Sequence, residues 1–297
     1  FSVYEMYFDY VLLSHLYITA GKKNTSWGNI RILNDTDEFE NDPDALSTNL
    51  LYDSRDGTSM QLRLPLGNFC FTAFLLYKGE NDDKVEQDEM SVAGSIEVVI
   101  GKTSFNFFGR KFSSADSEIV LKKKDNHIDP VVGAEVKRTI LGFDLYAQQL
   151  AYLGNKAKLK EFGKAVIKNE QLHNTDLEGF SKLIFSGGVY RIWETSGPDI
   201  GFNFEFQDVY TPAEKDHSKK VAFQGAVSKL GKGKNIAIGT TWKHYTNGNS
   251  GEIEPGIVLS GIFPNAKWKN GAEIKYGENY DRAKITVATT LLINVDY

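Results

Sequence analysis

The chain has 297 residues and a formal net charge of −5, so its charge gives no reason to expect nucleic acid as a partner. Its single cysteine, Cys70, excludes a disulfide framework within the chain. No uninterrupted run of about 18 apolar residues is present, which excludes a transmembrane helix. That test does not apply to a transmembrane β-barrel, whose polar inner face dilutes the hydropathy signal.

The first half of the chain alternates apolar and polar residues in pairs of segments. A period of two is that of a β-strand, whose successive side chains point to opposite faces. Short turns near Ser14, Gly67, Gly101 and Gly142 join the two members of each pair, whereas long polar stretches join one pair to the next. The expected strands cover 1–13 and 16–23, 59–66 and 69–78, 91–100 and 103–112, and 131–141 and 143–153.

The stretch 34–56 is strongly acidic and too polar for any core. We expect a solvated outer loop. Clustered carboxylates can bind Ca²⁺, but the twelve-residue calcium loop needs Gly at its sixth position and Glu at its twelfth, and neither is in place. No metal site is therefore expected.

A second kind of pattern interrupts the strands at 155–179. Leu159, Phe162, Val166 and Ile167 fall at helical spacing among five lysines, which predicts a short amphipathic helix inserted in a loop. Such a helix could fold inward and narrow a lumen, or it could pack on the rim. The second arrangement is favoured.

The second half of the chain is the most regular. Ile200, Phe202, Phe204 and Phe206 share one face of a predicted strand, and similar alternation recurs to the end of the chain. With turns near Gly197, Gly231 and Pro264, the count reaches fifteen strands. A β-sandwich does not readily accommodate this many amphipathic strands joined in up-and-down hairpins, whereas a closed barrel does. We therefore predict an all-β, antiparallel transmembrane barrel of about sixteen strands over 1–297.

The last strand, 283–297, carries apolar residues at alternate positions and ends on the aromatic Tyr297, where Phe is commoner. This strand resembles the C-terminal strand of bacterial outer-membrane β-barrels, although a long edge strand of a soluble sandwich would show the same alternation. The segment 21–28, GKKNTSWG, resembles a G-[KR]-x4-W-G stretch found early in several porin-like families, spirochaete ones among them. The resemblance implies the cell outer membrane, short periplasmic turns, longer outer loops, and a barrel-assembly machinery that engages the C-terminal strand.

Fifteen strands place the start of the first strand on the long-loop side, whereas single-chain bacterial barrels have an even number of strands. We therefore expect at least one strand before Phe1 in the full gene product. An intact mass of 33.3 kDa for the native protein would contradict this expectation, unless a further strand lies between Trp27 and Tyr52.

The candidate functional residues are charged side chains on the polar faces of the strands. Both signs are present, which suits a lumen that screens hydrated solutes by size and field rather than one that binds a solute tightly. The candidates are Arg63, Glu97, Glu135, Lys137, Glu205, Lys243, Lys267, Lys269, Glu273 and Lys275.

The function that these features predict is that of a porin, which passes small hydrophilic solutes by passive diffusion through the outer membrane. No catalytic motif accompanies the five scattered histidines, so neither an enzyme nor a cofactor is expected. Two alternatives stay open: a non-conducting barrel that acts as an adhesin, assembly partner or structural anchor, and a fatty-acid-type transporter of hydrophobic substrates. The sequence leaves open whether the barrel forms a homo-oligomer.

Overall fold

The computed structural model describes residues 6–22, 33, 58–77, 90–111, 129–168, 174–228, 230, 235–245, 250–260, 266–276 and 284–293. Several predicted features lie outside these residues. They are the acidic stretch 34–56, most of the segment 21–28, the turns at Gly231 and Pro264, and the terminal Tyr297.

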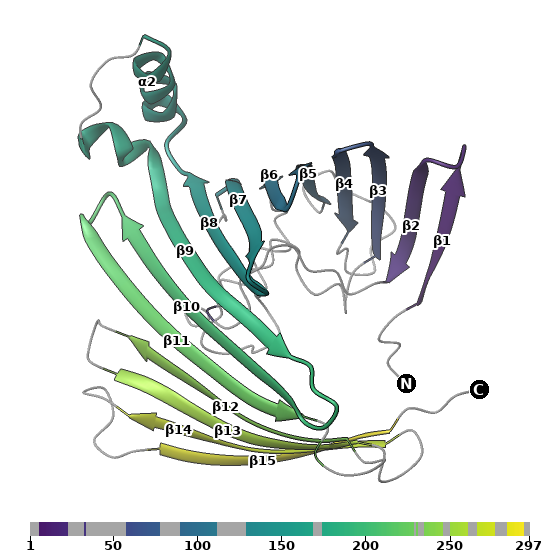
Figure 1. The fold of residues 1–297 in the computed structure, drawn as a ribbon. Coiled ribbons are helices and arrows are strands. Elements are labelled where there is room, and N and C mark those ends of the chain that lie inside the picture. The colour runs from purple at the N-terminus through teal and green to yellow at the C-terminus, as the bar shows by residue number, and fades with distance from the viewer. Residues whose placement is uncertain are drawn as a thin grey trace, which may run out of the picture. The chain divides into compact units, whose positions relative to one another are not determined.

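The described residues form a fifteen-stranded sheet in which the order of the strands follows their order in the chain and each strand pairs with its neighbours in that order. The resolved registers are antiparallel. The up-and-down, all-β prediction is therefore confirmed. In chain order (Figure 1) the strands are β1 Met6–Leu12, β2 Leu16–Lys22, β3 Thr58–Leu66, β4 Phe69–Tyr77, β5 Met90–Ile100, β6 Thr103–Lys111, β7 Val131–Ile140, β8 Phe143–Leu153, β9 Phe180–Trp193, β10 Asp199–Thr211, β11 Asp216–Ser228, β12 Asn235–Tyr245, β13 Ser250–Ser260, β14 Ala266–Tyr276 and β15 Lys284–Ile293.

Tight turns fix the register of the first hairpins. Leu66 pairs with Phe69 across Gly67–Asn68, and Ile100 pairs with Thr103 across Gly101–Lys102. Gly67 and Gly101 have φ of 61° and 59°, a left-handed conformation that glycine adopts without steric cost. The turn sequences therefore act as the predicted hairpin signals.

The chain divides into two compact units. The first contains residues 1–138, 146–185 and 209–217, and thus β1 to β6 with most of β7 and β8. The second contains residues 139–145, 186–208 and 218–297, and thus most of β10 and β11 with β12 to β15.

The predicted helix is present as α2, Lys156–Ile167, followed by the 3-10 helix η4, Asn174–Gly179. Asn155 caps α2, because its side-chain oxygen accepts hydrogen bonds from the backbone N–H groups of Ala157 (3.0 Å) and Lys158 (3.3 Å). The ring of Phe162 meets Phe180 edge-on at 5.2 Å, so α2 packs against the start of β9. Among the described residues, no helix is long and apolar enough to cross a membrane.

An apolar cluster in the first unit was not predicted. It consists of Phe108, Val131, Leu150, Ile184 and Val209, which are all buried and come from five successive strands, β6 to β10. A Cβ atom on Gly133, in the middle of β7, would collide with the side chains of both Phe108 and Leu150. The glycine therefore allows the two side chains to meet across β7.

The Leu141–Gly142 turn gives a test of the argument that turn glycines are needed for their positive φ. Gly142 has φ of 79°, and a Cβ atom there would lie 3.3 Å from Cζ of Arg191. Gly142→Ala should therefore lower the free energy of unfolding by about 1–2 kcal/mol, measured by urea unfolding followed through tryptophan fluorescence. Gly94→Ala is the matched control, because Gly94 lacks a positive φ and its added Cβ would meet only the carbonyl oxygen of Thr72, at 3.6 Å. Equal losses in the two variants would contradict the argument.

Candidate functional site

The two faces of β5 differ in an unusual way. Ser91 and Ala93 are buried on one face, with Glu97 half-buried further along it. Val92 and Ile96, on the opposite face, are 50% and 43% exposed. A water-soluble sheet buries its apolar face and exposes its polar one. In β5 the burial of the two faces is inverted.

The same inversion occurs in β10, which belongs mainly to the second unit. Asn203, Glu205 and Gln207 are fully buried, although all three are polar. Phe204, between them on the other face, is 40% exposed, and Phe202 is half-buried. These two phenylalanines therefore lie outside the apolar clusters of buried residues.

A polar cavity of about 370 Å³ lies on the polar face of β3 to β7. Four of the predicted functional residues, Arg63, Glu97, Glu135 and Lys137, line it together. The remaining lining residues are Gln61, Cys70, Thr72, Ser95, Ser104 and Asn106.

Cross-strand pairing explains why these residues meet. Cys70 pairs with Glu97, Glu97 with Asn106, and Asn106 with Glu135, so the four form one row across β4, β5, β6 and β7. Residues directly opposite each other on antiparallel strands have Cβ atoms about 5 Å apart. Two carboxylates therefore flank the Asn106 amide, one on each side.

Hydrogen bonds orient the side chains at the edge of this row. The Ser104 hydroxyl donates to Oε1 of Glu97 at 2.9 Å, and Nε of Arg63 donates to the Cys70 sulfur at 3.1 Å. The cavity thus combines two carboxylates, two cationic side chains and several neutral polar groups. Such a set can form hydrogen bonds with a hydrated solute of either charge.

Two amide side chains along this row have buried atoms without hydrogen-bond partners among the described residues. They are Oδ1 of Asn106 and both side-chain amide atoms of Gln148. Gln148 of β8 lies opposite Glu135 of β7. This register follows from the two-residue turn Leu141–Gly142 and from the hydrogen bond of 2.7 Å that the Leu153 N–H donates to the Pro130 carbonyl. The row of polar side chains therefore continues into β8.

The other predicted site residues are not brought to this cavity. Glu205 lies in the second unit, where it is fully buried and accepts a hydrogen bond from Nδ2 of Asn203 at 3.1 Å. In the backbone register Lys243 pairs with Glu252. The four candidates of β14 pair with residues of β15: Lys267 with Leu292, Lys269 with Thr290, Glu273 with Thr286, and Lys275 with Lys284. The side chains of these four lysine and glutamate residues, and that of Lys243, are not among the side chains that the structure describes.

Sequence reasoning missed the neutral members of the cavity because it considered only charged residues. Asn106 and Ser104 could have been found from register, since the turn at Gly101–Lys102 sets them opposite Glu97 and Val99. It also missed the apolar cluster, because doublets such as Phe107–Phe108 place one apolar side chain on each face. The polar face of these strands is therefore less uniformly polar than predicted.

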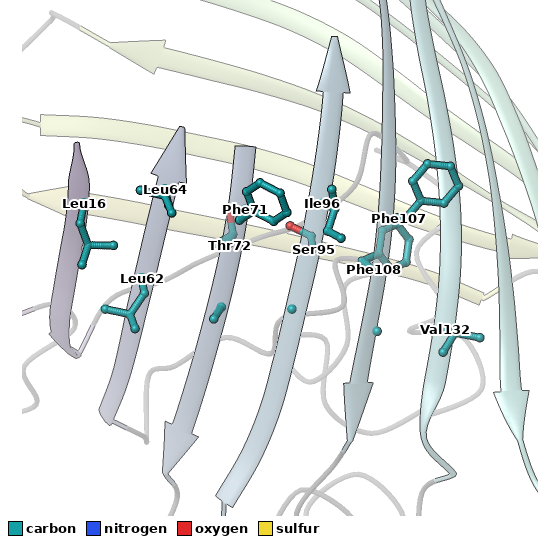
Figure 2. Close-up of a pocket in the computed structure, with 13 residues that line it drawn as sticks. Leu16, Leu62, Leu64, Phe71, Thr72, Ser95, Ile96, Phe107, Phe108 and Val132 are labelled. Carbon is teal, nitrogen blue, oxygen red and sulfur yellow. The ribbon is translucent and has the colours of Figure 1, made fainter. Parts of the chain in front are cut away.

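The opposite face of the same strands is apolar and hollowed (Figure 2). Its depression has a volume of about 710 Å³. Leu64, Phe71, Ile96 and Phe107 pair in sequence across β3 to β6 and form one side of it. The next row contains small residues, which explains the hollow: Ala73, Gly94 and Gly109. A polar cavity and an apolar depression thus lie back to back on one layer of strands.

No protein-family model and no curated protein matches this sequence. Among solved structures, a chain titled "Bacterial polysaccharide outer membrane secretin" matches with 13% sequence identity and a TM-score of 0.43, over 79% of this chain and 75% of that chain. A likeness this weak identifies neither a family nor a function.

The polar cavity gives a test based on the single cysteine. Cys70 should react with methyl methanethiolsulfonate, a small neutral thiol reagent, in the folded protein. Thr72→Trp should slow the reaction several-fold, because Thr72 lines the cavity beside Cys70. Phe71→Trp, one residue away on the opposite face, should leave the rate unchanged. Equal rates in the two variants would show that Cys70 is not reached through the cavity.

Proposed function

We propose that this chain forms a transmembrane β-barrel in a bacterial outer membrane and passes small hydrophilic solutes by passive diffusion. The observation that carries the proposal is the inverted burial of β5 and β10, where polar side chains are buried and large apolar ones exposed. Fully burying a Val, Leu, Ile or Phe side chain stabilises a protein in water by about 1.5–3 kcal/mol. Exposing many of them costs little only where the surroundings are hydrocarbon.

The length of the strands supports a membrane-spanning role. From Val92 to Ile100 the exposed apolar face of β5 rises about 26 Å, at about 3.3 Å per residue. The apolar band of an outer-membrane barrel is about 25 Å tall, and a tilted strand needs about 9–11 residues to cross it. Strand β5 has 11 residues and β6 has 9.

An aromatic row near the Leu141–Gly142 turn supports an interface between membrane and water. Phe143 meets Trp193 at 5.9 Å between ring centroids, Trp193 meets Phe202 at 6.4 Å, and Phe202 meets Phe223 at 5.9 Å. Cζ of Arg191 lies 4.5 Å from the Phe143 ring centroid, and Nη1 donates to the Leu141 carbonyl at 2.7 Å. Aromatic residues gather at both interfaces of membrane barrels, and arginine beside them keeps its charge near water.

The polar cavity supports passage of hydrophilic solutes. Its walls carry both signs of charge together with hydroxyl and amide groups. Closure of the sheet, through its two end strands or a further strand, would remove both open edges and enclose this face. An enclosed face of this kind is a water-filled path that discriminates by size and charge.

One observation favours a second candidate, a barrel that does not conduct. The apolar cluster of Phe108, Val131, Leu150, Ile184 and Val209 lies in the first unit, with Phe108 and Val131 on the same face of the strands as the polar cavity. Apolar constrictions can stop ion flow by excluding water. In that case the outer loops would carry the function, as an adhesin, assembly partner or anchor.

Planar-bilayer recording separates the two candidates. The folded protein should produce stepwise currents, and a thiol reagent that carries a bulky group should reduce the current by modifying Cys70 in the cavity. Phe108→Ala should enlarge the current by removing an apolar side chain from the cluster. Silence from a protein that is folded by its heat-modifiable gel mobility would overturn the pore and leave the second candidate.

Neighbouring residues on opposite faces test membrane insertion. Phe71→Lys places a charge on the apolar face, where lysine near the membrane midplane costs about 2–4 kcal/mol, and should reduce folding into lipid vesicles. Thr72→Lys places the same charge on the polar face and should leave the folded fraction unchanged. The folded fraction is measured by gel mobility without heating. Equal folding of the two variants would contradict the proposed orientation.

A further inference from the structure

The helix α2 carries a row of lysines on a face that the rest of the described protein leaves uncovered. Its twelve residues contain four lysines and one glutamate. Lys156, Lys160 and Lys164 follow one another at intervals of four residues, so they lie along one face of the helix. All three are exposed. This helix therefore presents a positively charged surface, although the whole chain has a net charge of −5.

The other side of α2 packs on the protein and fixes the orientation of the helix. The backbone N–H of Asn155 donates to the Gly179 carbonyl at 2.9 Å, which joins the two ends of the segment. Phe162 meets the Phe180 ring, as described above, and a Cβ atom on Gly179 would lie 2.8 Å from the backbone nitrogen of Leu159. Because Leu159 and Phe162 lie on the side of the helix away from the row of lysines, these contacts keep the row exposed.

The placement of the lysines does not serve the stability of the helix. The first turn of α2 contains no acidic residue, so Lys156 and Lys158 oppose the helix dipole there. Like charges four residues apart also destabilise a helix. Lys158 forms an ion pair with Glu178 of η4, but among the described residues no carboxylate pairs with the three lysines of the row. Residues that break a local rule without a compensating contact point to a function.

A large apolar side chain lies among these lysines. Ile167 follows Lys164 by three residues and Lys160 by seven, so it shares their face of the helix. It is 87% exposed. Lysine has an apolar stem and a charged end, so a surface of this kind suits the boundary where lipid phosphates lie above hydrocarbon. We call Lys156, Lys160, Lys164 and Ile167 the lysine face.

The position of α2 at the end of β8 agrees with such a boundary. From Phe143, in the aromatic row near the Leu141–Gly142 turn, β8 runs ten residues to Leu153, which is about 33 Å along the strand. A strand tilt of about 40° reduces this to about 25 Å, the height of the apolar band of an outer-membrane barrel. Helix α2 begins three residues after Leu153 (Figure 1) and thus at the opposite interface.

We propose that the lysine face of α2 binds the phosphate headgroups of anionic lipids at the surface of the membrane that the strands cross. The proposal rests on the membrane insertion stated in the proposed function, but it does not require conduction. The charge of the face is complementary to that of the lipid phosphates, and Ile167 would enter the layer beneath them.

The experiment uses a fluorescent label on the lysine face of the full chain. Ala157 is exposed and lies beside this face, so Ala157→Cys in a Cys70→Ser background is labelled with nitrobenzoxadiazole, whose emission shifts to the blue in a less polar environment. The protein is inserted into vesicles of phosphatidylcholine, or of phosphatidylcholine mixed with phosphatidylglycerol.

The emission should shift to the blue only in the vesicles that contain phosphatidylglycerol. About 1 M NaCl, which shortens the screening length to about 3 Å, should weaken the shift. Inorganic phosphate added to the phosphatidylcholine vesicles should not produce it. Equal spectra in the two kinds of vesicle, or an equal shift with inorganic phosphate, would overturn the proposal.

Substitutions assign the shift to particular side chains. Lys160→Gln should lower the ratio of attached to detached label about fivefold, since each lysine near an anionic surface strengthens attachment by about this factor. Lys102→Gln removes the same charge in the turn at the opposite end of the strands, and should leave the ratio unchanged. Ile167→Ser should lower the ratio about tenfold, and should do so in high salt as well. Equal ratios in Lys160→Gln and Lys102→Gln would contradict the assignment.

Gel mobility without heating reports insertion separately from the label. A chain that inserts into both kinds of vesicle with identical label spectra leaves the proposed barrel standing and removes the lipid contact. A chain that inserts into neither removes the barrel and the lipid contact with it. If Lys160→Gln does not insert, Lys156→Gln, from the same row, decides the outcome.

Discussion

The structure depends on strands that bury their polar side chains and expose their apolar ones. Backbone pairing satisfies the peptide groups of neighbouring strands in either water or hydrocarbon, so only the side chains determine which environment each face requires. On β5 the exposed residues include Val92 and Ile96, while Ser91 is buried. In β10 the buried Asn203, Glu205 and Gln207 alternate with phenylalanines.

The buried polar face is kept in place by hydrogen bonds between its own members. Asn203 donates to Glu205, and Nε2 of Gln207 donates to the Ser186 hydroxyl at 3.3 Å. Burying a polar group without a partner costs several times more than an ordinary hydrogen bond contributes, so such links are expected wherever the face is packed. Oδ1 of Asn106 and both side-chain amide atoms of Gln148 depart from this rule among the described residues.

Much of the fold could be predicted from the sequence, because a period of two and glycine-containing turns are local signals. The turns at Gly67, Gly101 and Gly142 set the registers that the structure has, and the lysine-rich segment after Leu153 does form a helix. The site was predicted less completely. Face assignment by alternation found the charged residues of the cavity, but the neutral Asn106 and the inward Phe108 required the register between strands. The sequence of one strand does not reveal which residues of the neighbouring strand lie opposite it.

The most direct test of this account is an accessibility scan of β5 in lipid bilayers. Nitroxide labels are placed one at a time at positions 91–98 in a Cys70→Ser background, and collision rates are measured with molecular oxygen, which concentrates in hydrocarbon, and with a water-soluble nickel chelate. Both collision rates should alternate with a period of two along the strand. The rate with oxygen should be highest at positions 92, 96 and 98, and the rate with the nickel chelate should be highest at positions 91, 95 and 97. Two profiles in the same phase, or maxima exchanged between the two faces, would contradict it.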